Sequence, residues 1–318
     1  MKIDVHNHAL PVSVQELVSA DARFGVKVEN GLVKRPNYAD HELFPELYDP
    51  AAKLAQLESR GLEGAVVCLE PSMFSYHLDV ELGEAMAEAA NRGLRELADS
   101  SGGRFRWMAH VPLQDPARAA EVLAAAAAEG AVGVEIGTSI AGGRLDEPEL
   151  VPFWQSVEST GLTVFLHNAY NAKVPGLEQY YLGNVIGNLL ETTICAERLV
   201  ASGTLARHPK VRIVLAHAGG YFPYQAGRLR HAKTVRPELA DSPIDPWDFA
   251  GQLIFDTITH DVQALAYLVS RAGVDNVVMG TDMPYDMSTP EPMRELLAAV
   301  DERTAKRIAE DNPARLFG

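Results

Sequence analysis

The sequence predicts a single (β/α)8 barrel of the TIM type, which belongs to the α/β fold class. Eight short apolar runs rich in β-branched residues recur along the 318 residues. Their nearly continuous hydrophobicity is typical of parallel strands that are buried on both faces. Segments with helical periodicity separate most of these runs, and the total length suits eight strand–helix units.

The predicted strands each end at a turn signal. They cover residues 2–8, 64–70, 105–111, 133–138, 163–168, 212–217, 253–257 and 276–282. The predicted helices cover residues 49–61, 79–100, 115–130, 147–160, 261–273 and 291–300. The first helix has Asp49-Pro50 at its start and Gly61 at its end, an asymmetry that favours a helix.

A doubly wound open sheet is the main alternative, but the Gly-rich phosphate turn expected after its first strand is absent. No linker or change of composition divides the chain. We therefore expect one domain over residues 1–318. Residues 18–48, between the first strand and the first helix, are predicted to form an irregular insertion over the barrel mouth.

Composition narrows the possible partners. The net charge of −15 disfavours nucleic acid and anionic membrane surfaces, which require a basic footprint. The two cysteines, Cys68 and Cys195, have no paired spacing, which fits a reducing compartment. No signal-peptide pattern or membrane-length apolar segment is visible, so we expect a cytoplasmic protein that acts on a small molecule.

The stretch KIDVHNH at residues 2–8 places two histidines almost at the N-terminus. Successive side chains of a strand alternate in direction, so His6 and His8 are predicted to share one face, with Ile3 and Val5 on the other. On this stretch alone, half of a metal site and a pair of solvated histidines are equally open interpretations.

Three further polar residues end other predicted strands: His167, His217 and Asp282. All five residues lie at carboxyl ends of strands, the rim where barrel enzymes build their sites. Barrel closure brings the first and eighth strands together, so His6 and His8 are predicted to lie beside Asp282. A lone histidine on an apolar strand is usually structural, but this combination predicts a shared site.

These residue types suit one divalent ion. We expect zinc, with manganese, iron or cobalt as alternatives, held by His6, His8, His167 and Asp282. Such a ligand set leaves a position for water, and a bound ion lowers the pKa of that water toward about 7. His217 is the candidate general acid and base, and we count Asp282 with it as catalytic.

The motifs DVHNH, VFLHN, VLAHAGG and VVMGTDMPY resemble the metal motifs of the amidohydrolase superfamily. More specifically, the chain resembles the non-hydrolytic decarboxylase branch around aminocarboxymuconate semialdehyde decarboxylase. Further similar segments cover residues 71–76, 133–138, 151–155, 191–194, 227–232 and 259–261. The resemblance implies a zinc barrel that acts on a small unsaturated or aromatic carboxylic acid. It implies the same four ligands, and it gives His217 the task of activating the metal-bound water.

The resemblance also implies a homodimer in which Arg228 binds a substrate carboxylate across the subunit interface. An ordinary ion pair is the alternative interpretation of this arginine. Lys53 stands where aminocarboxymuconate semialdehyde decarboxylase has an arginine, so it is predicted to contact substrate without the planar guanidinium fork. Asn168-Ala169 replaces a Pro-Trp pair, which would enlarge the pocket.

Four other residues receive predictions from their place in the pattern. Phe74 and Tyr76, after the second strand, are predicted to line the pocket, with packing under a loop as the alternative. Glu135 is predicted either to support a ligand histidine or to fill the barrel interior. His41 is predicted to lie at the surface.

The leading functional hypothesis is a metal-dependent decarboxylase, a carbon–carbon lyase. A hydrolase of a lactone or amide using the same site is the alternative, because the ligands alone do not separate the two reactions. A metal-binding barrel without catalysis is a third possibility. The presence of a proton-transfer candidate beside a complete ligand set weighs against it.

Overall fold

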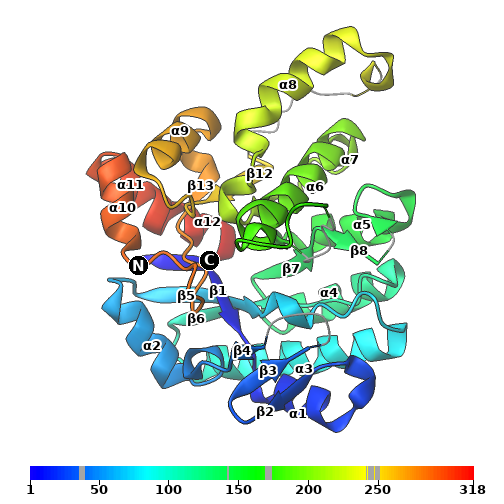
Figure 1. The fold of residues 1–318 in the computed structure, drawn as a ribbon, viewed down its shortest axis with the longest axis vertical. Coiled ribbons are helices and arrows are strands. Elements are labelled where there is room, and N and C mark those ends of the chain that lie inside the picture. Colours follow the sequence, from blue (N-terminus) through cyan, green and yellow to red (C-terminus); the bar gives the residue numbers. More distant parts are fainter. Residues whose placement is uncertain (36–39, 142, 169–173, 241, 243–246, 248–250) are drawn as a thin grey trace.

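In the computed structural model, eight parallel strands form one sheet that curves into a barrel, with helices around it (Figure 1). The structure describes residues 1–35, 40–141, 143–168, 174–240, 242, 247 and 251–318. The strands, in their order around the sheet, are β1 (Ile3–Ala9), β5 (Gly64–Leu69), β6 (Phe105–Ala109), β7 (Gly133–Gly137), β10 (Thr163–His167), β11 (Ile213–Leu215), β12 (Leu253–Asp256) and β13 (Val277–Val278). Each predicted run overlaps one of these strands, so the (β/α)8 prediction is confirmed.

The barrel closes where the chain after β13 returns to β1. The amide of Val5 donates to the carbonyl of Met279 at 2.9 Å, and the amide of His8 donates to the carbonyl of Met283 at 2.9 Å. Within the predicted strand over 276–282, Val277 and Val278 form β13, and these bonds hold the chain after them against β1. Closure in this way brings the two histidines of β1 beside the end of the eighth strand.

Helices follow the strands and cover the outside of the barrel. They are α1 (Val12–Ala20), α2 (Pro50–Ser59), α3 (Val80–Asp99), α4 (Pro116–Ala128), α5 (Val151–Thr160), α6 (Leu189–Ala201), α7 (Thr204–Arg207), α8 (Phe222–Val235), α9 (Val262–Ala272), α10 (Pro292–Ala299), α11 (Glu302–Lys306) and α12 (Asn312–Phe317). Carboxylates of Asp49, Asp115 and Asp261 accept amide hydrogens in the first turns of α2, α4 and α9. These caps confirm the start signals seen in the sequence.

The sequence analysis did not predict α6 or α8. Helix α8 buries three of its 14 residues and therefore has no broad apolar stripe to give it a helical period. Figure 1 shows α8 projecting away from the body of the barrel.

Apolar side chains fill the barrel interior below the rim. Ile3 and Val5 lie in one buried cluster with Phe165, whose ring packs 4.8 Å from that of His6. The prediction that Ile3 and Val5 face away from the histidines is therefore wrong. β1 pairs with β5 through an irregular register in its middle, and such a bulge interrupts the alternation of side chains.

The segment predicted as an irregular insertion has some regular structure. Strands β2 (Lys27–Glu29), β3 (Leu32–Lys34) and β4 (His41–Glu42) form a three-stranded antiparallel sheet within residues 18–48. Residues 36–39 of this segment lie outside the described part of the chain. That residues 18–48 are an insertion stays a prediction.

Both cysteines are buried and free of disulfide bonds, Cys68 within β5 and Cys195 within α6. Among the described helices, none has the length and apolar character that a membrane span requires. The cytoplasmic location expected from the sequence stays a prediction.

Candidate metal centre

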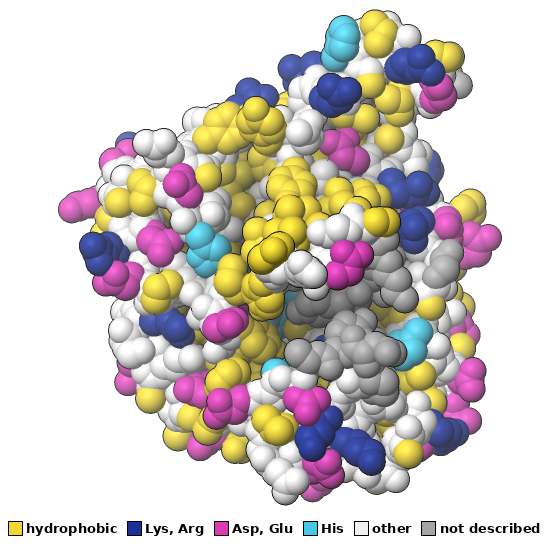
Figure 2. All heavy atoms as spheres, viewed as in Figure 1, with side chains coloured by type: hydrophobic (Ala, Val, Ile, Leu, Met, Phe, Trp, Pro, Cys, Tyr) yellow, Lys and Arg dark blue, Asp and Glu magenta, His cyan; other side chains and the backbone are white. Residues whose placement is uncertain are grey.

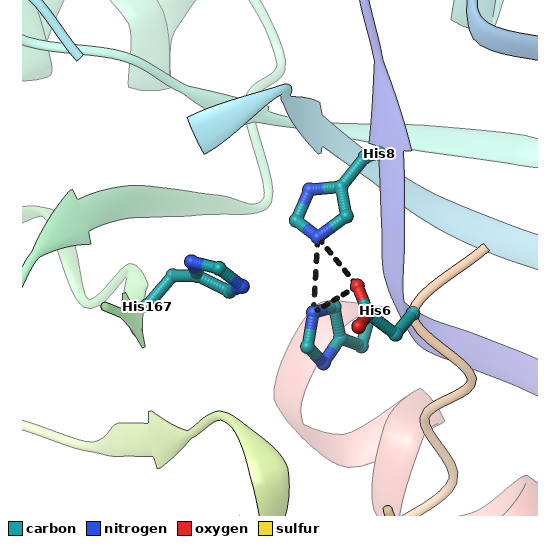
Figure 3. A group of neighbouring side chains, drawn as sticks. His6, His8 and His167 are labelled. Carbon is teal, nitrogen blue, oxygen red and sulfur yellow. Dashed lines mark hydrogen bonds and ion pairs between the residues drawn. The ribbon is translucent and has the colours of Figure 1, made fainter. Parts of the chain in front are cut away.

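Two histidines of β1 project into the barrel at its carboxyl-end rim (Figure 3). His6 and His8 are fully buried. Their Nε2 atoms are 3.0 Å apart, and their rings meet edge to face with centroids 4.9 Å apart. At this separation at most one proton fits between the two nitrogens, so at least one lone pair is directed into the space that they share.

His167 and Asp282 complete the group. His167 ends β10, and its ring centroid lies 5.3 Å from that of His6 and 5.0 Å from that of His8. Oδ1 of Asp282, which follows β13, lies 3.3 Å from Nε2 of His6 and 3.1 Å from Nε2 of His8. One ligand atom from each of the four residues lies within 4.8 Å of every other. The structure thus brings together the four residues predicted to hold a metal ion.

The spacing of these atoms suits a tetrahedral ion. Zinc bonds of 2.0–2.1 Å separate the ligand atoms of a tetrahedral site by about 3.3 Å. The three separations measured among His6, His8 and Asp282 are 3.0, 3.3 and 3.1 Å. Three imidazoles and one carboxylate are also donors that a borderline divalent ion prefers.

The electrostatics of the group favour a cation. Burial lowers the pKa of His6, but the carboxylates of Asp282 and Asp256 outweigh burial and raise it to about 10. Burial raises the pKa of Asp282, but His6, His217 and His8 outweigh burial and hold it well below its usual value. The site therefore retains an ionised carboxylate and attracts positive charge at the point where the lone pairs meet.

Two ligand histidines have a good acceptor beside their second ring nitrogen. Nδ1 of His6 lies 2.8 Å from Oδ2 of Asp256, and Nδ1 of His167 lies 3.0 Å from the carbonyl oxygen of Asn168. Each acceptor fixes a proton on Nδ1, so Nε2 is the nitrogen that offers its lone pair when an ion binds. This is the tautomer that a metal-binding histidine requires.

The second nitrogen of His8 faces a buried thiol and a buried carboxyl group. Its Nδ1 lies 3.5 Å from Sγ of Cys68 and 3.9 Å from Oε1 of Glu135. Burial raises the pKa of Glu135 well above its usual value and so favours the protonated carboxyl group. Glu135 thus lies inside the barrel and near His8, but neither of its carboxyl oxygens has a hydrogen-bond partner among the described residues, so the choice between its two predicted roles stays a prediction.

Asp256, at the end of β12, orients several groups of the site. Its Oδ2 accepts from His6 and from the amide of His217 at 2.9 Å. Its Oδ1 accepts from the amides of Ala218 at 2.7 Å and Ile258 at 3.1 Å. The sequence analysis missed this residue, although an acidic residue that ends an apolar strand at the same rim was a usable signal.

His217 lies beside the ligand group in the short turn η6 (His217–Gly219) after β11. Its backbone is left-handed, with φ of 54°. Nε2 of His217 lies 3.5 Å from Oδ2 of Asp282, and the ring centroids of His6 and His167 are 5.2 and 5.1 Å away. Its Nδ1 is buried without a hydrogen-bond partner among the described residues. This placement suits proton transfer at the edge of the ligand group.

A pocket of about 700 Å³ opens above this group, and His167, His217 and Asp282 line it. Arg35 also lines the pocket, and it is the one lysine or arginine among the described lining residues. Its guanidinium donates to the carbonyl of Ser72 at 2.9 Å. Further lining side chains are His41, Phe44, Tyr181 and Tyr285.

Lys53 departs from its predicted role as a substrate contact. Its side chain is fully buried, and Nζ donates to Oδ1 of Asn7 at 2.6 Å and to the carbonyl of His8 at 2.7 Å. It is absent from the described pocket lining. The reason is that Lys53 extends from α2 to β1, where its ammonium group binds the side chain of Asn7 and the backbone of His8.

The other predicted substrate contacts also lie outside the described lining of the pocket. Phe74 and Tyr76 are buried and stack on each other and on His110, with centroids 5.5 to 5.7 Å apart, which matches the packing alternative. Arg228 lies on α8 with an exposed side chain. Whether it serves a second subunit stays a prediction.

The structure adds Arg35 and His41 to the pocket lining, and both come from residues 18–48, the segment predicted to lie over the barrel mouth. His41 is partly buried and lines the pocket, so its surface assignment is wrong. The predicted location of residues 18–48 over the mouth was the signal that could have singled out Arg35. Of the pair that departs from the family pattern, Asn168 is fully buried, and Ala169 lies outside the described residues.

Comparison with known proteins places this site in a family. The chain is 27% identical to 2-amino-3-carboxymuconate-6-semialdehyde decarboxylase of Dictyostelium discoideum over 329 aligned positions, which cover 100% of this chain and 92% of that protein. The structure of 5-carboxyvanillate decarboxylase from Sphingomonas paucimobilis superimposes with a TM-score of 0.85 at 22% identity, covering 99% of this chain and 98% of the other. A dihydroxybenzoic acid decarboxylase from a Polaromonas species, solved with bound manganese and the inhibitor 2-nitroresorcinol, has a TM-score of 0.79 at 23% identity, covering 99% and 96%. The amidohydrolase family model matches residues 3–318, and the chain therefore belongs to the amidohydrolase family.

Proposed function

We propose that this chain is a metal-dependent carboxy-lyase that removes carbon dioxide from a small aromatic or unsaturated carboxylic acid. The observation that carries the proposal is the ligand group of His6, His8, His167 and Asp282 with His217 beside it on the pocket side. The similar proteins described above are decarboxylases by name. Their names favour carbon–carbon bond cleavage over hydrolysis of a lactone or amide.

The resident ion of this proposal is a single divalent metal, and we expect zinc. The tetrahedral spacing of the ligand atoms supports zinc, whereas the manganese in the Polaromonas structure supports manganese as the alternative. When bound, such an ion supplies a Lewis acid that activates water or polarises a substrate oxygen. Elemental analysis of the purified protein tests both the stoichiometry and the identity of the ion.

His217 moves the proton in this scheme. Its Nε2 lies beside Asp282 at the pocket floor, where it holds a proton and delivers it to the substrate carbon that bears the carboxylate. The bond from that carbon to the carboxylate then breaks, and its electron pair restores the conjugation of the substrate. Carbon dioxide leaves, and the carbon keeps the proton. Asp256 orients this step because it accepts the amide hydrogen of His217.

Arg35 binds the acidic substrate in this proposal. A guanidinium stays charged and pairs with a carboxylate through two parallel hydrogen bonds. Arg35 projects into the same pocket as His217 and therefore orients a carboxylate relative to the proton donor. It takes the role in the pocket that the sequence analysis assigned to Lys53.

Arg228 contributes a second cation if the protein is a homodimer, as we propose. Helix α8 projects from the barrel (Figure 1) and exposes Arg228 and Tyr224, the latter with 77% of its side chain accessible. Figure 2 shows hydrophobic side chains gathered on this face near the base of α8. Tyr180 and Tyr181, which precede α6 in the chain, are 87% and 57% exposed, as expected of a surface that a second copy covers.

The decisive experiment measures carbon dioxide release from a panel of hydroxybenzoates, carboxyvanillates and muconate semialdehydes. Release from at least one acid, dependent on bound metal, supports the proposal. Hydrolysis of a lactone or amide without release from any acid would replace it with the hydrolase alternative. Metal binding without either reaction would leave a barrel that has no catalytic role.

A mixing experiment tests the dimer. Subunits carrying His217→Ala lack the proton donor, and subunits carrying Arg228→Ala lack the proposed second cation. If Arg228 acts across the interface, mixed dimers contain one site that has both residues, and activity returns on mixing. Equal inactivity before and after subunit exchange, or a monomeric mass in light scattering, would refute the arrangement.

A further inference from the structure

A buried chain of hydrogen bonds starts at α2 and reaches the metal ligands of β1. Nζ of Lys53 donates to Oδ1 of Asn7 at 2.6 Å and to the carbonyl of His8 at 2.7 Å. Nδ2 of Asn7 donates to Oδ2 of Asp4 at 2.9 Å. Lys53, Asn7 and Asp4 are all fully buried. The ammonium group therefore binds the backbone of one ligand and the residue between the two ligands of β1.

Asp4 extends this chain to the other end of the sequence. Its Oδ1 accepts the amides of His6 and Thr281, each at 3.0 Å, and its Oδ2 accepts the hydroxyl of Thr281 at 2.6 Å. The hydroxyl oxygen of Thr281 also accepts the amide of Met283 at 3.3 Å. Asp282 lies between these two residues, so the chain holds the backbone on both sides of the fourth ligand.

The position of this chain of hydrogen bonds in the fold explains why it is needed. The register between β1 and β5 is irregular between Asp4 and Asn7, so regular strand pairing does not hold this part of β1. The residue Asp282 has a left-handed backbone with φ of 66°, which a non-glycine side chain adopts only when its surroundings impose it. Both ligand-bearing segments thus depart from regular structure at the point where the buried chain joins them.

We propose that Lys53, Asn7, Asp4 and Thr281 act as one positioning network that sets the separation between the histidines of β1 and Asp282. The four residues lie outside the described pocket lining, so none of them is a catalytic residue. The inference rests on the metal site of the proposed function and adds the reason for its geometry. Lys53 forms the end of the network on α2, and Thr281 forms the end beside Asp282.

Lys53→Met tests the network because methionine fills similar space without the ammonium group. We expect the affinity for zinc, measured by titrating the metal-loaded protein with a competing chelator, to fall about 10- to 100-fold, the range for outer partners of metal ligands. The visible absorption spectrum of the cobalt-substituted protein is expected to shift, because the ligand geometry changes. Leu57→Ala is the matched control, since Leu57 is fully buried on the same helix and its apolar side chain has no polar group to join the network. It is expected to lower the melting temperature while leaving zinc affinity within about twofold.

Thr281→Val provides a test from the other end. This substitution removes the hydroxyl group that donates a hydrogen bond to Asp4, and it keeps the shape of the side chain. We therefore expect zinc binding to weaken about tenfold. The double variant with Lys53→Met is expected to lose less than the product of the two single effects, because either change disconnects the same chain. If Lys53→Met does not fold, the zinc affinity of Thr281→Val alone tests the proposal.

The proposal is overturned if both variants keep wild-type zinc affinity and an unchanged cobalt spectrum, or if Leu57→Ala weakens zinc binding as much as Lys53→Met. Independent, fully multiplicative effects would also overturn the claim of a single network. A failure of the proposed function looks different, because the wild-type protein would then bind no ion or release no carbon dioxide. The affinity measurements do not depend on identifying the substrate.

Discussion

Replacing Asp256 with asparagine should weaken metal binding without changing any metal ligand. The side chain keeps its size, but one carboxylate oxygen becomes an NH2 group. Each oxygen of Asp256 accepts two donors, His6 and the His217 amide on Oδ2, and the Ala218 and Ile258 amides on Oδ1. In either orientation of the new side-chain amide, its NH2 group therefore faces two N–H donors and cannot accept a hydrogen bond from them.

The size of the effect follows from these contacts. A hydrogen bond to a charged group contributes about 1.5–3 kcal/mol, and 1.4 kcal/mol corresponds to about tenfold in a binding constant. Losing the bond to His6, or turning its ring to recover it, is therefore expected to weaken metal binding roughly 10- to 100-fold. At saturating metal kcat should fall as well, because the same carboxylate holds the turn that carries His217.

The assay is chelator competition on the metal-loaded protein, followed by carbon dioxide release at saturating metal. Asp146→Asn is the matched control, because Asp146 accepts two hydrogen bonds from Arg198 at 2.7 and 2.9 Å and belongs to neither the ligand group nor the described pocket lining. It is expected to change stability slightly and metal affinity not at all. Wild-type metal affinity and kcat in Asp256→Asn would refute the reasoning.

Four further predictions follow from the same geometry. His217→Asn should lower kcat about 10²- to 10⁴-fold while elemental analysis still finds one ion per chain; loss of the ion would instead identify His217 as a ligand. Arg35→Met should raise KM for the acid at least about tenfold and change kcat less, as steady-state kinetics will show. Removing the ion with a chelator should abolish carbon dioxide release, and adding zinc or manganese should restore it. Burial lowers the pKa of His110 to about 3, so the unfolded chain takes up a proton below pH 6.5 and the folded chain does not. Its contribution to stability is therefore complete above pH 6.5 and falls by about 2 kcal/mol between pH 7 and 5, which urea denaturation of the wild type against His110→Phe will measure.

The fold and the ligand group were predictable because both depend on local pattern and barrel closure. Apolar runs identify strands without knowledge of their partners, and the carboxyl ends of barrel strands share one rim. His167 could thus be assigned to the same site as His6 although 161 residues separate them in the sequence. The prediction needed only the order of the strands.

The supporting residues were not predictable in this way, because their roles depend on which group each one faces. Lys53 and Arg35 are both cationic residues between the first and second predicted strands. In the structure, Lys53 is fully buried beside β1, whereas Arg35 lines the pocket. Charge alone does not separate these cases. Asp256 shows the same limit, since its value to the site comes from His6, which lies 250 residues earlier.

The regular alternation of a strand was the assumption that failed. It placed Ile3 and Val5 opposite the histidines, whereas the irregular register of β1 lets both pairs face the interior. A bulge of this kind leaves no trace in hydrophobic periodicity, because every residue of β1 is buried. Its signal lies in Asp4 and Asn7, polar residues within an apolar strand that require partners.

The two residues proposed to be catalytic share a feature that connects the separate experiments. His217 and Asp282 both have left-handed backbones, with φ of 54° and 66°. A buried carboxylate supports each turn, since Asp256 accepts the amide of His217 and Asp4 accepts the amide of Thr281, next to Asp282. Each carboxylate also accepts an N–H from His6, one from its ring and the other from its backbone. One candidate ligand, His6, is thus tied to both turns, so Asp256→Asn and Thr281→Val should each weaken metal binding and shift the cobalt spectrum.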